Sequence, residues 1–191
     1  MKMLVRMKLL EDTIFGNGQS IPGEEDISVL CDSKGFPYYK GGTMKGIFRE
    51  ELERLLSWKK CDNAKETVSR LLGTSGSNDS NEKGRLIFSD FCVADCVKKA
   101  VSDEIKDPSE IFNAFTSVRT FTKINENGMV KNGSLRVARC VNSGISLFGE
   151  IECEDDDSED VKDLIKEVLS QIKWIGTMRN RGFGKVRIEL I

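Results

Sequence analysis

The spacing of apolar residues changes several times along this chain of 191 residues, and the order of these changes constrains the fold most. Residues 1–10 alternate between apolar and more polar positions, the period of a half-buried strand, with apolar side chains at Met3, Val5, Met7 and Leu9. Strand character returns in residues 85–91, 145–153 and 186–190. Four strands are therefore expected, with other structure between them.

Two segments show helical spacing instead. In residues 43–58 the apolar positions recur three or four apart, Thr43 is the expected N-cap, and the helix should end near Trp58. The second helix is expected to open at Ser158 and to carry its apolar face as far as Ile172. Its first turn is acidic, which suits the positive end of a helix dipole. The expected order is thus strand, helix, strand, strand, helix, strand.

This order predicts an α+β fold with a ferredoxin-like (RRM-like) β-α-β-β-α-β sheet, in a single domain over residues 1–191. The turn pairs Asn127-Gly128 and Asn132-Gly133 predict an inserted arm, either a protruding hairpin or irregular. We expect the core in residues 1–10, 43–58, 85–91 and 144–191, a loop at 11–42, a polar mobile loop at 73–84, and the arm at 109–141.

The composition excludes several classes of function. The formal net charge is −2, so no overall positive field draws the chain onto nucleic acid, and an RNA site must be local. The absence of histidine excludes Ser-His-Asp triads, Cys-His pairs and HExxH zinc sites.

The six cysteines form no CxxC pair, which indicates reduced thiols and a cytoplasmic protein. Cys92 and Cys96, if they lie on one helix face, would hold only half of a metal site. Cations interrupt residues 1–10 too often for a signal peptide or membrane span.

The densest motif lies in residues 175–186, between the second helix and the last strand. Gly176, Gly182 and Gly184 would let the backbone approach a phosphate chain, while Arg179, Arg181 and Lys185 supply positive charge. The segment also matches the RNP1 element of RNA recognition motifs in part, but its base-stacking positions hold Lys185 and Ile188 instead of aromatic residues. An ordinary helix-to-strand loop is the alternative.

A second basic motif opens the first helix, in residues 39–49. Its helix N-terminus offers unpaired backbone N–H groups and the Thr43 hydroxyl, and Lys45 and Arg49 lie four apart on one face. This combination would hold an RNA phosphate. A capped surface helix with two solvated cations is the alternative.

Together these motifs resemble a known family. Residues 175–186, in the form IGxxRxRGFGKV, resemble the C-terminal glycine-rich signature of the RAMP superfamily, and residues 39–49 resemble the start of its first helix, with Lys40-Gly41-Gly42-Thr43 in place of Pro-Gly-Ser-Ser. Residues 84–90 and 119–136 are similar to the backbone subunits of type III CRISPR interference complexes. The resemblance implies a guide-RNA-coating subunit whose partners are target RNA, other RAMP subunits and a large signature subunit.

The resemblance also implies roles for particular residues. RNA binding is carried over to Thr43, Lys45, Arg49, Gly176, Arg179, Arg181, Gly182, Phe183, Gly184 and Lys185. The arm would act as a thumb that wedges between guide and target bases, which implicates Lys123, Met129, Lys131 and Arg136.

In the same family an aspartate in the loop before the first helix cleaves the paired target RNA, and the closest match is Asp26. A carboxylate can hold Mg²⁺ or Mn²⁺ for such a cut without histidine, and Glu24, Glu25 and Asp32 are acidic neighbours. The proline that the family usually has two residues later is Ser28 here, which leaves catalysis open. Two alternatives remain: a cleavage-inactive cap or accessory subunit, and a repeat-processing endoribonuclease, which usually has two such domains and a histidine.

Overall fold

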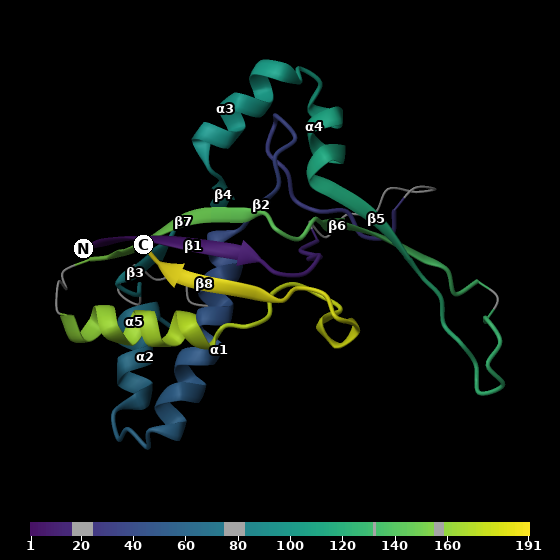
Figure 1. Ribbon diagram of the computed structural model, residues 1–191. Helices are drawn as coiled ribbons and strands as arrows, with labels where there is room; N and C mark the ends of the chain where they lie inside the picture. Colours follow the sequence, from purple (N-terminus) through teal and green to yellow (C-terminus); the bar gives the residue numbers. More distant parts are fainter. Residues whose placement is uncertain (17–24, 75–82, 132, 155–158) are drawn as a thin grey trace.

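The computed structural model describes residues 1–16, 25–74, 83–131, 133–154 and 159–191. Helices and strands are interspersed along the described residues (Figure 1). The elements are β1 (Lys2–Leu9), β2 (Tyr38–Tyr39), α1 (Gly41–Trp58), α2 (Ala64–Leu72), β3 (Leu86–Phe88), β4 (Phe91–Val93), α3 (Asp95–Glu104), α4 (Pro108–Phe115), β5 (Thr116–Phe121), β6 (Arg136–Val141), β7 (Ser146–Cys153), α5 (Glu159–Gln171), a short 3₁₀ helix (Arg179–Arg181) and β8 (Val186–Leu190).

The main sheet has the strand order β2-β4-β7-β1-β8, with β3 also paired to β7, and all of these pairs are antiparallel. The central strand β1 places Met7 opposite Leu147 of β7 on one side and opposite Ile188 of β8 on the other. Because β3 and β4 follow α1 and β8 follows α5, this order is the ferredoxin-like arrangement. The predicted α+β, ferredoxin-like fold is confirmed.

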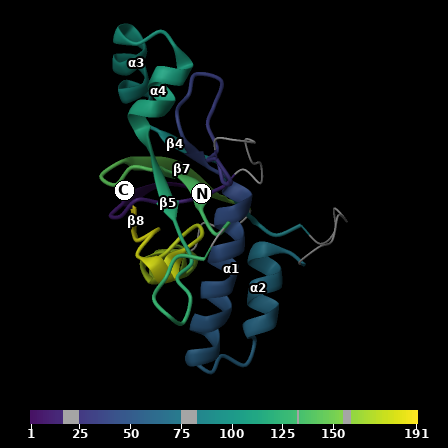
Figure 2. The same ribbon diagram turned by 90° about the vertical axis from the view of Figure 1, so that its right-hand side faces the viewer.

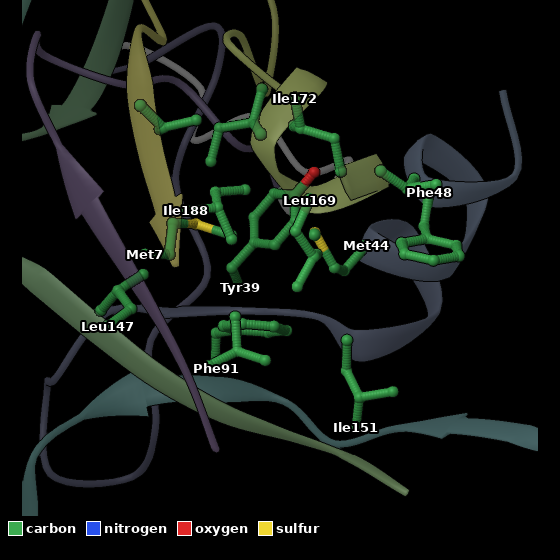
Figure 3. Close-up of a cluster of buried hydrophobic side chains, with 14 of the residues drawn as sticks. Met7, Tyr39, Met44, Phe48, Phe91, Leu147, Ile151, Leu169, Ile172 and Ile188 are labelled. Atoms are coloured by element: carbon green, nitrogen blue, oxygen red, sulfur yellow. The ribbon is translucent and has the colours of Figure 1, made fainter. Parts of the chain in front are cut away.

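Helices α1 and α5 cover one face of the sheet, and α2 packs beside α1 (Figures 1 and 2). The alternating residues Met3, Val5, Met7 and Leu9 of β1 point to these helices and are buried. Figure 3 shows the resulting cluster, in which strand residues meet Met44 and Phe48 of α1. Gly149 leaves room for the Phe91 ring, since a Cβ there would lie 2.8 Å from it. This core holds the start of α1 and the end of α5 beside each other.

The other face of the sheet carries exposed side chains of both charges. Arg6 pairs with Glu189 and Lys2 with Glu152, while the neighbouring Lys8 and Arg187 are exposed. Acidic and basic residues thus lie side by side on it, and its aromatic side chains Tyr38 and Phe148 are only partly exposed and are separated by Cys92.

The arm protrudes far from the sheet (Figure 1). Its strands β5 and β6 pair from Thr116–Val141 to Phe121–Arg136, and Asn127 and Gly128 form the predicted turn, in which the Asn125 carboxamide accepts two backbone N–H bonds. Asn132 lies outside the described residues. The expectation that the arm begins at residue 109 is wrong, because Asp107 caps helix α4 and Pro108 occupies its first position.

Helix α1 begins two residues before its expected N-cap. Gly41 is the first helical residue, and its N–H donates to the Asp90 carboxylate at 2.8 Å, so Thr43 lies inside the first turn and caps nothing. A Cβ at Gly41 would collide with the carbonyls of Phe88 and Ser89, which explains a glycine at this position. The cap therefore comes from a residue distant in sequence, which local patterns do not reveal.

Other boundaries also differ from the expectations. The strand expected at 85–91 is divided into β3 and β4, and helices α2 and α3 were not predicted, because α2 is short and α3 buries none of its side chains fully. Cys92 lies in β4 and Cys96 in α3, so they do not share a helix face. Ser158, the expected start of the second helix, and residues 75–82 of the expected mobile loop lie outside the described residues.

Candidate nucleic-acid interface

Residues 10–14, which follow β1, connect the arm to the glycine-rich loop (residues 175–186). Thr13 bridges Val141 at the end of β6, and Ile14 bridges Thr177 in the loop. The Asp12 carbonyl accepts a bond of 2.9 Å from the N–H of Gly184. These bonds fix the glycine-rich loop and the arm relative to each other.

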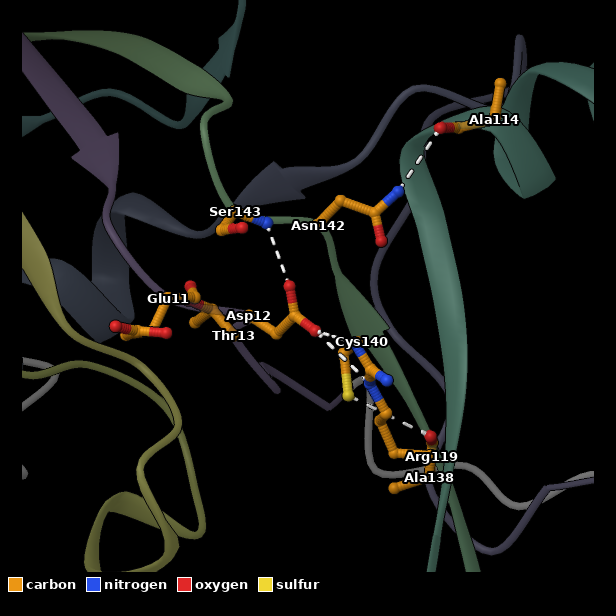
Figure 4. A network of polar contacts seen from close by, with 9 residues as sticks. All are labelled: Glu11, Asp12, Thr13, Ala114, Arg119, Ala138, Cys140, Asn142 and Ser143. Carbon is orange, nitrogen blue, oxygen red and sulfur yellow. Dashed lines mark hydrogen bonds and ion pairs between the residues drawn. The ribbon is translucent and has the colours of Figure 1, made fainter.

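The Asp12 carboxylate strengthens this connection (Figure 4). It accepts bonds from Arg119 Nη2 at 2.5 Å and Nε at 3.2 Å, and from the Ser143 backbone N–H at 3.0 Å. Partial burial alone would raise the pKa of Asp12, but the bonds from Arg119 and Ser143 outweigh it and lower the pKa below its ordinary value. Asp12 is therefore an anion that holds β5 against the body.

The three glycines of the loop have different roles. Gly176 (φ +72°) and Gly184 (φ +82°) lie so close to the carbonyl oxygens of Ile14 and Ile175 that a Cβ would collide with them. Gly182 (φ +84°) has open space where its Cβ would be. Internal packing thus accounts for two of the glycines, and only Gly182 leaves room for an approaching chain.

A pocket of about 270 Å³ lies between the first turns of α1 and the glycine-rich loop, and we call it the α1–loop pocket. Both predicted basic motifs contribute to it, Thr43 from α1 and Gly176 and Arg179 from the loop. The first N–H groups of a helix lack partners within it and attract anions, and in α1 the Gly41 N–H is already bonded to the Asp90 carboxylate. The other lining residues are Phe15, Gly16, Leu30, Tyr39, Lys40, Ile47, Glu50 and Thr177.

Lys45 and Arg49 lie on a different face of α1 from Thr43. Lys45 lines a separate pocket with Lys83, beside β3, and Arg49 donates to the Leu72 carbonyl at 2.9 Å. Burial, and then the charges of Arg49 and Lys83, lower the pKa of Lys45. The three α1 residues therefore do not gather at one point, and their contacts with RNA stay predictions.

A second pocket, of about 490 Å³, lies where the arm meets the glycine-rich loop, and we call it the arm-root pocket. Arg119 and Phe121 of β5 face Arg181, Gly182 and Phe183 across it. The two phenylalanine rings pack edge to face at 5.5 Å, and the Arg181 guanidinium lies 5.8 Å from the Phe121 ring. Aromatic rings beside arginine are the groups on which unpaired bases stack.

The remaining predicted cations lie apart from both pockets. Lys185 lines a shallow pocket beside the outer edge of β8, together with Lys173 and Arg187. Lys123 is exposed on the arm, and Arg136 Nη1 lies 3.6 Å from the carboxylate of Asp26 at the arm's base. The arm also exposes apolar side chains: Val118, Ile124, Met129, Val130 and Leu135.

Asp26 lies against the base of the arm, with its side chain 42% exposed. Its carboxylate accepts a bond of 2.7 Å from the Val137 N–H, and its own N–H donates to the Val137 carbonyl. The neighbouring Glu25 is buried and paired with Arg139. Asp26 thus already has two partners, Arg136 and Val137, in the free protein.

The described residues around Asp26 do not form a metal site. Glu24 lies outside them, Glu25 points to Arg139, and Asp32 pairs with Lys98 at 2.9 Å. In the described ranges no three Cys, Asp or Glu side chains converge on a point that would hold an ion. One carboxylate with two protein partners does not provide the oxygen ligands that Mg²⁺ or Mn²⁺ requires.

Several residues of these pockets were missed in the sequence. Phe121 follows Arg119 by two positions, so the strand period alone would have placed both on one face of β5. The pairing of Asp12 with Arg119 joins residues 107 apart and left no local signal. Tyr39 is the first residue of the second basic motif, but only its burial in the structure distinguishes it.

The structure thus defines an α+β protein of ferredoxin-like topology, with a protruding arm and a glycine-rich loop before its last strand. A family model described as "RAMP superfamily" matches residues 6–187. The chain belongs to the RAMP superfamily, as predicted.

Solved structures show the same fold. A chain in "Cryo-EM structure of the Type III-B Cmr-beta bound to cognate target RNA" matches with a TM-score of 0.72 and 13% identity, and a chain in "Type III-B Cmr-beta Cryo-EM structure of the Apo state" with 0.74 and 12%. Each match covers 100% of this chain and 97% of the other. A search of curated proteins finds no match. Within the described segments, no helix is long and apolar enough to cross a membrane.

Proposed function

We propose that this chain is an RNA-binding subunit of a type III CRISPR complex that holds guide RNA by its backbone. One observation carries the proposal: the start of α1 and the glycine-rich loop, more than 130 residues apart, line one pocket with cations at its rim. Membership of the RAMP superfamily and the likeness to chains of Cmr-beta structures, one of them bound to target RNA, support it.

The chemistry of the two pockets suits a single strand of RNA. Lys40 and Arg179 are exposed at the α1–loop pocket, where they outnumber the acidic Glu50 and would neutralise a phosphate close to the start of α1. Arg181 and Phe121 at the arm-root pocket would contact a neighbouring base. Such contacts read the backbone and stack on bases without reading sequence, which fits recognition by base pairing.

The arm would act next to this strand. Near the tip of the arm, the described residues include four apolar side chains that are each about 60% exposed, Ile124, Met129, Val130 and Leu135. Lys123 is exposed beside them. Apolar side chains on an extended arm favour wedging between stacked bases. We therefore propose that the arm separates segments of the guide–target duplex.

Binding of single-stranded RNA to the purified chain tests the proposal. The double variant R179A/R181A should weaken binding and reduce the slope of log K against log salt by about one, because the phosphate contact of Arg179 is lost together with the base contact of Arg181. The matched control, K8A/R187A, removes two exposed cations from the open face of the sheet and should change neither. An equal loss of RNA affinity in both variants would mean that binding depends only on net charge, and it would contradict the proposed contacts.

Cleavage of target RNA through Asp26 with Mg²⁺ or Mn²⁺ stays a prediction. Since the described residues do not hold a metal by themselves, any ion would need ligands from outside them, and the Arg136 and Val137 contacts of Asp26 compete with that role. The test is target cutting by the guide-loaded complex with the D26N variant, with guide binding measured in parallel. Equal cutting by D26N and wild type would leave a structural RNA-binding role.

The partners proposed are guide RNA, target RNA, further RAMP subunits and a large signature subunit. Copy number in the purified complex distinguishes a backbone subunit, which is present several times, from a cap or accessory subunit, which is present once. A repeat-processing endoribonuclease would instead cut repeat RNA without any partner protein. Incubating the isolated chain with repeat RNA tests this alternative.

A further inference from the structure

The hydroxyl of Tyr39 is buried at the α1–loop pocket and has no hydrogen-bond partner. Tyr39 is 1% exposed, and its ring packs edge to face on Phe15 at 5.3 Å. Figure 3 shows the hydroxyl oxygen directed away from Phe91, which lies on the sheet side of the ring. Burial raises the pKa of Tyr39 strongly, against the opposing charge of Arg179, so the hydroxyl stays protonated. A buried hydroxyl without a partner is costly and needs an explanation.

The pocket around this hydroxyl is apolar inside and polar at its rim. Phe15, Leu30 and Ile47 supply its apolar lining, whereas Lys40 and Arg179 are exposed at its edge. A phosphate would lose its hydration against the apolar lining, so it would stay at the rim with the cations. A ribose, with an apolar ring face and hydroxyl groups, fits such an interior.

We propose that the α1–loop pocket takes one ribose of an RNA strand, whose 2′-hydroxyl exchanges a hydrogen bond with the Tyr39 hydroxyl while the adjoining phosphate lies at Arg179. The pocket would then distinguish RNA from DNA, because only RNA carries this hydroxyl. This inference rests on the proposed RNA-binding function and adds to it the group that is recognised.

Entry of the ribose requires a small displacement of the pocket wall, because solvent does not reach the Tyr39 hydroxyl. Part of the wall is formed by Gly176, Thr177 and Arg179 of the glycine-rich loop, and the Thr177 and Arg179 side chains are exposed. The exposed Arg179 side chain can turn outward, whereas the Thr177 hydroxyl would have to give up its bond of 3.4 Å to the Ile14 carbonyl.

The test compares the Y39F variant with wild type for binding of an RNA oligonucleotide and of DNA with the same sequence. Y39F should bind the RNA about fivefold more weakly, the effect of one hydrogen bond, and the DNA with unchanged affinity. The matched control is Y38F, which removes the same atom from the partly exposed neighbour in β2 and should leave both affinities unchanged.

A second measurement separates recognition from folding. Because the free protein leaves the Tyr39 hydroxyl unpartnered, Y39F should unfold at the same temperature as wild type or at a higher one. A fall in the melting temperature of Y39F would mean that the hydroxyl is bonded inside the free protein, to an ordered water for example, and would overturn the inference.

The two proposals fail in different ways. If wild type shows no salt-dependent RNA binding, the proposed function itself is wrong. If wild type binds RNA but Y39F keeps the same ratio of RNA to DNA affinity, the function stands and the ribose contact is rejected.

Discussion

At the scale of residues, Gly184 and Gly182 require glycine for different reasons. Gly184 has no space for a Cβ atom, whereas Gly182 requires glycine only for its backbone angle. Both have φ above +80°, but only Gly184 lies against a backbone carbonyl, that of Ile175. We expect G184A to lower the free energy of unfolding by roughly 3 kcal/mol and G182A by about 1 kcal/mol. Urea denaturation of both variants measures this. Equal losses would mean that the loop adjusts at Gly184 without cost.

Asp12 gives a prediction in pH. Because its folded-state pKa lies below its ordinary value of 3.8, its stabilisation is fully present above pH 3.8 and is lost as the pH falls through the lower folded value. D12N should therefore be about 1 kcal/mol less stable than wild type at pH 7, and the difference should shrink below pH 3.8. Denaturation at several pH values tests it, with D62N, at an exposed residue, as the control. A difference independent of pH would contradict the ionic role.

At the scale of elements, the start of α1 depends on Asp90 instead of Thr43. Asp90 accepts the Gly41 N–H, and replacing such a cap costs about 1 kcal/mol. D90A should lower the free energy of unfolding by that amount, whereas T43A should change it little, because the exposed Thr43 caps nothing. Thermal and urea unfolding compare the two. A larger loss of unfolding free energy in T43A than in D90A would mean that Thr43 is the N-cap after all, as the sequence predicts.

The arm offers a second prediction at this scale. Phe121 pairs with Arg136, so a two-residue Asn-Gly turn can replace residues 122–135 without changing the register of β5 and β6. The shortened chain should keep its melting temperature, because the described residues removed are exposed apart from the partly buried Ser134. If the arm contacts bases, binding of a guide–target duplex should fall about tenfold. A large fall in melting temperature would show that the arm supports the core.

Much of the sheet was predictable because its signals are local. The alternation in β1, β7 and β8 and the helical faces of α1 and α5 persist for five residues or more, and burial on one side enforces each of them. By contrast, β3 and β4 have three residues each, too few to show a period or the break at Ser89 and Asp90. Helix α3 buries no side chain fully, so it carries no clear apolar stripe.

The candidate site was predictable only in part. The two basic motifs were visible as charges and glycines, but which faces they share depends on the packing of α1 against the loop. This packing brings Thr43 to Arg179 and turns Lys45 and Arg49 away. The sequence also did not reveal that Gly176 and Gly184 serve internal contacts with residues 14 and 175.

At the scale of the whole molecule, charges of both signs lie on the open face of the sheet and around the two pockets. The open face mixes Arg6 and Lys2 with acidic partners, whereas Arg179 and Arg181 stand beside the helix start and the arm root. Glu11 and Asp12 line the arm-root pocket and Glu50 lines the α1–loop pocket, so positive charge there is confined to individual side chains of a protein with a net charge of −2.

The α1–loop pocket has one wall from residues 39–50 and the other from residues 176–179. During synthesis on the ribosome, the second wall is made after almost all of the sheet and after both helices that cover it. A nascent chain that has already formed α1 therefore still lacks half of the pocket. The protein becomes able to grip a ligand there only once β8 has docked beside β1, so completed folding precedes loading.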